Sequence, residues 1–237
     1  MARMTLDDLV MQLRAAFGGE LRAVVLYGSA ASGEHVPKKS DYNVLVLVDS
    51  LAADRLAGAS AAAHAWADAG NSPPLTLTME EWRGSADIFP MEYADVLEWH
   101  KVLYGELPTD VRVDPAHLRL ELEHEAMGTL LQLRRGALAA GNEGREQLEL
   151  LEASASTILV VFRAFLRFRG EAPPTDRGAL VERVAVAAGL DAEPFLAMVR
   201  HKRGAPKLKA AGAGGVLAGT LDGVQRLVKH LDRSARG

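Results

Sequence analysis

The sequence predicts an α/β (α+β) domain with a small mixed sheet over residues 1–108, followed by an α-helical bundle domain over residues 109–237. Three observations support this order. Short apolar runs bounded by Gly and Pro, the pattern of buried strands, occur in the first half. In the second half, apolar residues recur at spacings of three and four, the pattern of amphipathic helices. Between the halves, residues 105–115 contain two prolines and no helical period, as a linker does.

Helices and strands alternate in the first half. Thr5 and Asp8 have the spacing of a capping box, which predicts a short helix that ends at Gly18. Strands are expected over 21–27, 42–48 and 75–78, and an alanine-rich helix over 52–69. The first two strands are continuously apolar, so we expect both of their faces to be buried. Residues 86–104 fit a short strand or a helix, and both assignments stay open.

The second half is expected to be a bundle of helices. Its predicted helices cover residues 117–140, 145–169, 177–188, 192–202 and 215–233. Several amphipathic helices joined by short connections are typical of a bundle. The low-complexity stretch over 210–215, made of Ala and Gly, is predicted to be a flexible loop.

Composition excludes several classes of protein. The 237 residues carry a formal net charge of −4 and include no cysteine. Disulfides, thiolate zinc sites and cysteine nucleophiles are therefore excluded, and a nucleic-acid partner is not expected without a basic field. The N-terminus lacks the apolar core of a signal peptide, and Arg163 interrupts the most apolar run. We therefore expect a cytoplasmic protein with no membrane partner.

The most informative pattern joins the first two predicted strands. The first strand ends at Gly28 and Ser29, and the second opens after Ser40 with Asp41 and Asn43. A glycine lets the backbone approach a phosphate closely, and a serine can donate its hydroxyl and amide hydrogens. Side chains two apart on a strand share a face, so Asp41 and residue 43 form a natural pair of metal ligands. Lys38 and Lys39, in the loop between, are either phosphate contacts or solvated side chains.

This pattern resembles the signature of the DNA polymerase beta-type nucleotidyltransferase superfamily, particularly its aminoglycoside-nucleotidyltransferase-like branch. The resemblance covers residues 21–105 and implies a nucleoside triphosphate as substrate or ligand and Mg²⁺ as cofactor. It implies nucleotide-binding roles for Gly28, Ser29, Lys39 and Ser40, and a catalytic, metal-binding role for Asp41. The second metal carboxylate of the family falls on Asn43. The third falls on Thr76, or on Thr78 if the register shifts by two residues.

Asn43 and Thr76 depart from the family pattern. Only one of three expected acids remains, and a hard dication prefers anionic oxygen ligands. The sequence therefore predicts weak Mg²⁺ binding, with Asn43 as a weak ligand. Asp49, Glu80, Glu81, Asp87 and Glu92 are nearby acids, but none occupies the strand position of a substitute.

Three functions stay open. The chain is a nucleotidyltransferase-fold protein that binds a nucleotide or a partner with weak or lost catalysis. Alternatively, it is an active Mg²⁺-dependent nucleotidyltransferase that moves a nucleoside monophosphate to a small-molecule or protein hydroxyl. Alternatively, it is a toxin–antitoxin-type interaction module, although Arg226 and His230 are one residue closer than the Arg-x4-6-His spacing of HEPN ribonucleases. A homodimer is compatible with each. The basic run over 200–203 is either a solvated helix end or a phosphate-binding patch.

Overall fold

The computed structural model describes residues 4–33, 42–204 and 206–234. The chain divides into two compact units, Met1–Asp114 and Pro115–Gly237. The sequence placed this division at residue 108. The segment after residue 105 stays with the first unit because Leu107, Val111 and Val113 pack against its core.

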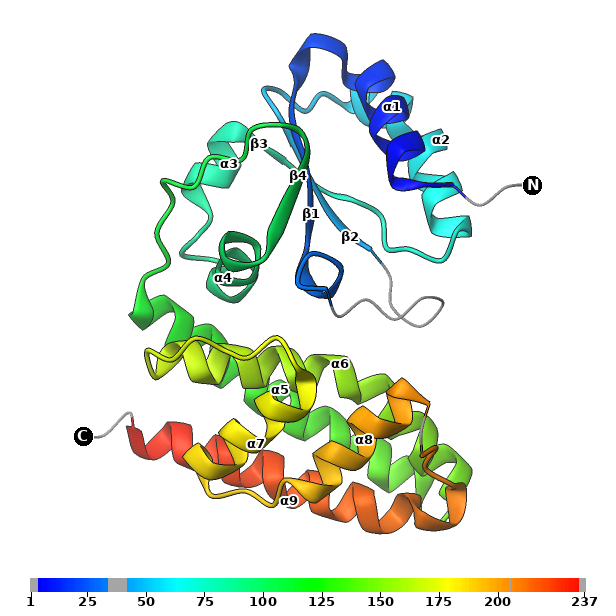
Figure 1. Cartoon of the computed structure of the whole chain (residues 1–237), viewed down its shortest axis with the longest axis vertical. Helices are drawn as coiled ribbons and strands as arrows, with labels where there is room; N and C mark the ends of the chain where they lie inside the picture. The colour runs from blue at the N-terminus through cyan, green and yellow to red at the C-terminus, as the bar shows by residue number, and fades with distance from the viewer. Residues whose placement is uncertain (1–3, 34–41, 205, 235–237) are drawn as a thin grey trace. The chain divides into compact units, whose positions relative to one another are not determined.

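The first unit contains a four-stranded sheet in the order β3-β2-β1-β4 (Figure 1). The strands are β1 (Leu21–Tyr27), β2 (Asn43–Val48), β3 (Leu75–Thr78) and β4 (His100–Gly105). β1 pairs antiparallel with β2 and β4, whereas β3 runs parallel to β2. The sheet is therefore mixed, and the predicted fold class of this unit is confirmed.

Helices cover the two faces of this sheet separately (Figure 1). Side chains of α1 (Leu6–Phe17) and α2 (Ala53–Asp68) form one core with Val24, Val44 and Val46. The opposite core joins Val25 and Leu45 to Trp82, Tyr93 and Val96 of α3 (Met79–Gly84) and α4 (Pro90–Glu98). Both middle strands are buried on both faces, as their continuous apolar sequence predicted.

Local sequence explains where these helices begin and end. Thr5 and Asp8 form the predicted capping box of α1, and Gly18, with φ of 55°, ends that helix. Thr78 and Glu81 form a second capping box at α3. The segment 86–104 contains both a helix and a strand, α4 and β4. It read ambiguously because the two short elements follow each other with only Trp99 between them.

The second unit is a helical bundle, in agreement with the predicted fold class. Its helices are α5 (Pro115–Ala140), α6 (Gly144–Phe168), α7 (Arg177–Ala188), α8 (Glu193–Arg203) and α9 (Ala210–Ser234). α6 contacts each of the other four, so its apolar residues form the centre of the core. Within the described ranges, no helix combines the length and apolarity that crossing a bilayer requires.

The prediction of a flexible loop over 210–215 is wrong, because these residues form the start of α9. Their small side chains allow the beginnings of α6 and α9 to lie against each other. A Cβ added at Gly144 would lie 2.4 Å from the carbonyl oxygen of Ala210. One added at Gly214 would lie 3.0 Å from Oε1 of Gln147. Tertiary packing thus keeps helical a segment whose glycines disfavour a helix.

Candidate functional site at the end of the sheet

A tight bend at Gly28 and Ser29 follows directly after β1. The carbonyl of Gly28 accepts hydrogen bonds from the amides of Ala31 and Ser32, both at 3.0 Å, and a short 3-10 turn (η2, Gly28–Ala30) results. The hydroxyl of Ser32 donates to the carbonyl of Ser29 at 3.3 Å. Gly28 has φ of 71°, a left-handed conformation that residues with a Cβ rarely adopt. The bend therefore requires a glycine at this position.

Asn43 lies directly beside this bend. It pairs with Tyr27 in the β1–β2 ladder. A Cβ added at Gly28 would lie 3.1 Å from Nδ2 of Asn43, so the amide side chain occupies the space next to the glycine. The backbone amide of Tyr42 donates to Oδ1 of Asn71 at 3.1 Å, which anchors the chain just before β2 begins. The structure thus brings Gly28, Ser29 and Asn43 together at one end of the sheet.

Three predicted site residues, Lys39, Ser40 and Asp41, lie outside the described residues. Their roles in nucleotide and metal binding stay predictions.

Thr76 and Asn43 lie on opposite faces of the sheet. In the parallel β2–β3 ladder Thr76 pairs with Val46, and Thr78 pairs with Val48. Paired residues share a face, and successive residues alternate between faces. Thr76 and Thr78 therefore lie on the face covered by α1 and α2, whereas Leu75 and Leu77 lie on the face of Asn43. The sequence motif located the third strand correctly but assigned the third carboxylate position to its wrong face.

The described residues on the Asn43 face do not fit a pair of magnesium ions. Within residues 4–33, 42–204 and 206–234, no group of three His, Cys, Asp or Glu side chains could hold a metal. Asn43 offers one neutral oxygen, and Leu75 and Leu77 offer none. Magnesium sites use carboxylates together with substrate phosphates. This part of the face therefore lacks the anionic ligands that such a site requires.

His100 joins the same end of the sheet, although the sequence analysis did not single it out. It is the first residue of β4 and pairs with Tyr27, so Asn43 and His100 flank Tyr27 on the two neighbouring strands. Its Nδ1 lies 2.8 Å from the carbonyl oxygen of Val96. Since a carbonyl oxygen only accepts, Nδ1 carries the hydrogen, and Nε2 of the neutral ring is the acceptor nitrogen. The ambiguous segment 86–104 concealed the strand that positions this ring.

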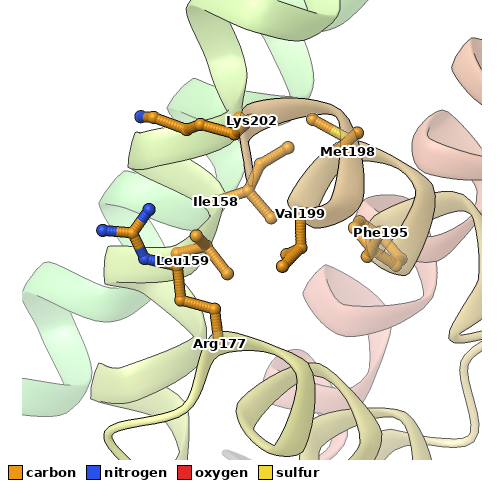
Figure 2. A pocket seen from close by; sticks show the side chains of 8 residues that line it. Ile158, Leu159, Arg177, Phe195, Met198, Val199 and Lys202 are labelled. Carbon is orange, nitrogen blue, oxygen red and sulfur yellow. The ribbon is translucent and has the colours of Figure 1, made fainter. Parts of the chain in front are cut away.

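A small cavity in the second unit lies among α6, α7 and α8 (Figure 2). Its walls are mainly apolar, including Ile158, Leu159 and Phe195, and Arg177 and Lys202 supply its charged groups. Its space of about 10 Å³ is enough for roughly one water molecule. The cavity is therefore too small for a nucleotide or an acceptor substrate.

The basic run over 200–203 is held in local interactions. Arg203 pairs with Asp176 at 2.6 Å, and this guanidinium is the main cause that lowers the pKa of Asp176. His201 contacts Glu152 at 2.6 Å, and Lys202 donates to Ser156 at 2.5 Å. Arg200 pairs with Glu193. These contacts favour a structural role at the end of α8 over a phosphate-binding patch.

A wider groove runs along the end of α9 beside the end of α7, and its volume is about 460 Å³. Arg226, Lys229 and Arg233 line it together with His230 and Asp222. Asp222 accepts from Arg226 at 2.7 Å, and the carbonyl end of α7 carries partial negative charge. Both features offset the positive charge of the groove, so charge alone does not mark it as an anion site.

Comparisons with known proteins agree with this architecture. No known protein family matches the sequence, and no curated protein sequence matches it. Among solved structures, a toxin–antitoxin complex with AMP-PNP matches over 57% of this chain and 96% of its own, with 19% identity. Its TM-score of 0.30 is too low to support an argument.

The second solved structure is spectinomycin adenyltransferase AAD(9) from Enterococcus faecialis with ATP and spectinomycin. The match covers 96% of this chain and 98% of that one, with a TM-score of 0.65 and 11% identity. The chain therefore shares the fold of an adenyltransferase over nearly its whole length.

Proposed function

We propose that this protein binds a nucleoside triphosphate at the bend formed by Gly28 and Ser29, and that its nucleotidyl transfer is weak or lost. The observation that carries the proposal is the close approach of the Asn43 amide to Gly28, 3.1 Å from a Cβ built there. This contact joins the glycine-serine bend to the start of β2, where the resemblance places nucleotide and metal ligands.

The chemistry of the bend suits a phosphate group. Gly28 leaves the backbone without a side chain at its closest point, and Ser29 is partly exposed. The Ser29 hydroxyl, its amide and the Asn43 Nδ2 hydrogens are donors that phosphate oxygens accept. Lys39, which the resemblance assigns to nucleotide binding, would add a cation from the loop between the strands.

Weak catalysis follows from the charge of the same site. Phosphoryl transfer depends on positioning and on neutralising negative charge that spreads over the transferred group. Asn43 supplies a neutral amide where the family has a carboxylate, and the residues of β3 on this face are leucines. Binding of the ground-state nucleotide needs less neutralisation than its transition state, so binding survives changes that slow transfer.

His100 favours the second candidate, an active transferase that acts on a hydroxyl of a small molecule. With Nδ1 donating to the Val96 carbonyl, Nε2 is the ring nitrogen that can accept a proton from an acceptor hydroxyl. The adenyltransferase that shares this fold was solved with ATP and spectinomycin, so spectinomycin is a reasonable first acceptor to test.

Calorimetric titration of ATP, with EDTA and separately with MgCl₂, tests the first proposal. We expect binding that changes less than about tenfold between the two conditions. Gly28→Ala and Ser29→Ala should each weaken it about tenfold, because the first strains the bend and the second removes a donor. Gly58→Ala and Ser60→Ala, in exposed positions of α2, are the matched controls and should bind normally. No ATP binding in either buffer would overturn the proposal.

Incubation with labelled ATP, MgCl₂ and spectinomycin separates the two candidates. The active transferase is supported if product forms and if His100→Gln lowers the rate of its formation at least about a hundredfold. The affinity for ATP should be unchanged in this variant. ATP binding without any transfer product supports the first proposal. Transfer that His100→Gln leaves unchanged excludes His100 as the group that accepts the proton.

A further inference from the structure

An exposed apolar stripe follows the outer surface of α5. Four large apolar side chains of this helix are exposed: Leu120 by 64%, Met127 by 40%, Leu131 by 43% and Leu138 by 84%. Successive helix residues are rotated by about 100°, so these four lie within about 20° of one direction. The buried residues of α5, such as Leu122, Ala126 and Leu133, point to the opposite side, into the bundle. The stripe is therefore a second apolar face, distinct from the one that builds the core.

The spacing of the stripe is symmetric about residue 129. Leu120 and Leu138 are equally far from this position, and so are Met127 and Leu131. If two α5 helices lie antiparallel with a two-fold axis at 129, Leu120 of each copy faces Leu138 of the other. Met127 likewise faces Leu131. A self-complementary surface of this kind is what a two-fold dimer requires.

On one flank of the stripe, charged groups are complementary in the same arrangement. Glu123 and Arg134 lie on the same flank, one before and one after residue 129 at nearly equal distances. The two-fold axis brings Glu123 of each copy beside Arg134 of the other copy, so the dimer contains two such pairs. In the single chain these groups contact Arg119 and Gln225, at 2.9 Å and 2.8 Å, and remain on the surface.

Gly128 lies on one flank of the stripe, about 80° around the helix from it and one residue from the axis. This glycine lies in the middle of α5, and a Cβ built on it would meet nothing within 4 Å. Packing within the chain therefore does not require a glycine there, although glycine lowers helix stability by about 1 kcal/mol relative to alanine. A small residue there leaves room for the helix of a second copy at the edge of the stripe.

We propose that α5 forms an antiparallel two-fold dimer interface, in which the stripe of Leu120, Met127, Leu131 and Leu138 packs against its own copy. This inference is independent of the proposed nucleotide site. The paired stripes contain eight apolar side chains within a length of about 27 Å, the rise of 18 helical residues. So short a seam predicts a dimer that dissociates on dilution.

Analytical ultracentrifugation over a range of concentrations tests the interface. The unchanged protein should pass from monomer to dimer as its concentration rises. Leu131→Glu should raise the dissociation constant at least about tenfold, because it places two charges near the axis of the apolar seam. Val186→Glu is the matched control, since Val186 is 87% exposed on α7, away from the stripe. A monomer at every concentration, or equal loss of dimer in both variants, overturns the proposal.

Cysteine cross-linking tests the relative orientation of the two α5 helices. Because the sequence contains no cysteine, only the introduced cysteines can form a disulfide. In the proposed dimer, residue 120 is about 27 Å from its own copy but faces residue 138. Leu120→Cys alone and Leu138→Cys alone should therefore not cross-link on mild oxidation, whereas a mixture of the two should. Efficient cross-linking of Leu120→Cys to itself would indicate parallel helices and would contradict the two-fold arrangement at 129.

Discussion

Neighbouring residues of β2 serve opposite faces of the sheet, and the two faces differ at one end. Val44 is 2% exposed in the core shared with α1 and α2. Asn43, one residue earlier, is partly exposed on the other face beside Gly28, with His100 two strands away. One face is closed by apolar side chains along the whole strand. The other is apolar under α3 and α4 and polar where the strand begins.

This difference explains why one residue of the motif was misplaced. A motif match gives positions along a strand, but strand pairing decides which face each position occupies. The pairing of Thr76 with Val46 puts Thr76 on the closed face, whereas Leu75 lies on the face of Asn43. A change of one residue in register exchanges the two faces completely.

The largest expected effect is a difference in stability between two variants, each of which places one carboxylate on one of the two faces. Val44→Asp buries a carboxylate in the closed core and should destabilise the protein by more than about 4 kcal/mol. Asn43→Asp changes a partly exposed polar residue and should alter stability by less than about 1 kcal/mol. Urea denaturation measures both. Similar losses would show that the Asn43 face is closed as well.

Engineered carboxylates provide a sharper test of the register. In an Asn43→Asp background, Leu75→Glu adds a second acid on the same face and should strengthen Mg²⁺ binding at least about tenfold. Thr76→Glu, in the same background, adds the acid to the opposite face and should bind no better than Asn43→Asp alone. Calorimetric titration with MgCl₂ makes the comparison. A stronger effect from Thr76→Glu would contradict the β2–β3 pairing.

The buried tryptophans of the two faces should also differ. Nε1 of Trp82 donates to the carbonyl of Pro108 at 3.0 Å, whereas Nε1 of Trp66 is buried without a partner in the described part of the chain. Trp82→Phe should therefore cost about 1 kcal/mol more than Trp66→Phe, since only the former breaks a hydrogen bond. Thermal and urea unfolding give the two values. Equal costs would mean that the Trp82 hydrogen bond contributes nothing net.

The last effect is confined to alkaline pH. Burial of Tyr93, which stacks on Trp82 with ring centroids 4.3 Å apart, raises the pKa of its hydroxyl to about 12. The unfolded value is lower, so the stabilisation is complete below about pH 10 and is lost as pH rises toward 12. Stability measured across this interval should fall more in the natural protein than in Tyr93→Phe. Parallel curves would indicate that Tyr93 titrates normally.

Much of the fold follows from local patterns. The capping box at Thr5, the apolar run over 21–27 and the periodic spacing in the second half predicted elements that the structure contains. Where prediction was wrong or left open, neighbours distant in sequence decided the outcome. The glycine-rich start of α9 is helical because α6 packs against it, and β4, within the ambiguous segment 86–104, is paired with β1.

The sequence by itself determined the mixed sheet, the bundle and the glycine-serine bend, because turn chemistry and apolar periodicity act through near neighbours. Tertiary structure alone decided that Asn43 meets Gly28, that His100 flanks Tyr27 and that Thr76 lies on the opposite face. These relations depend on strand register. Register is set by the simultaneous burial of side chains from several elements, and a single strand does not contain that information.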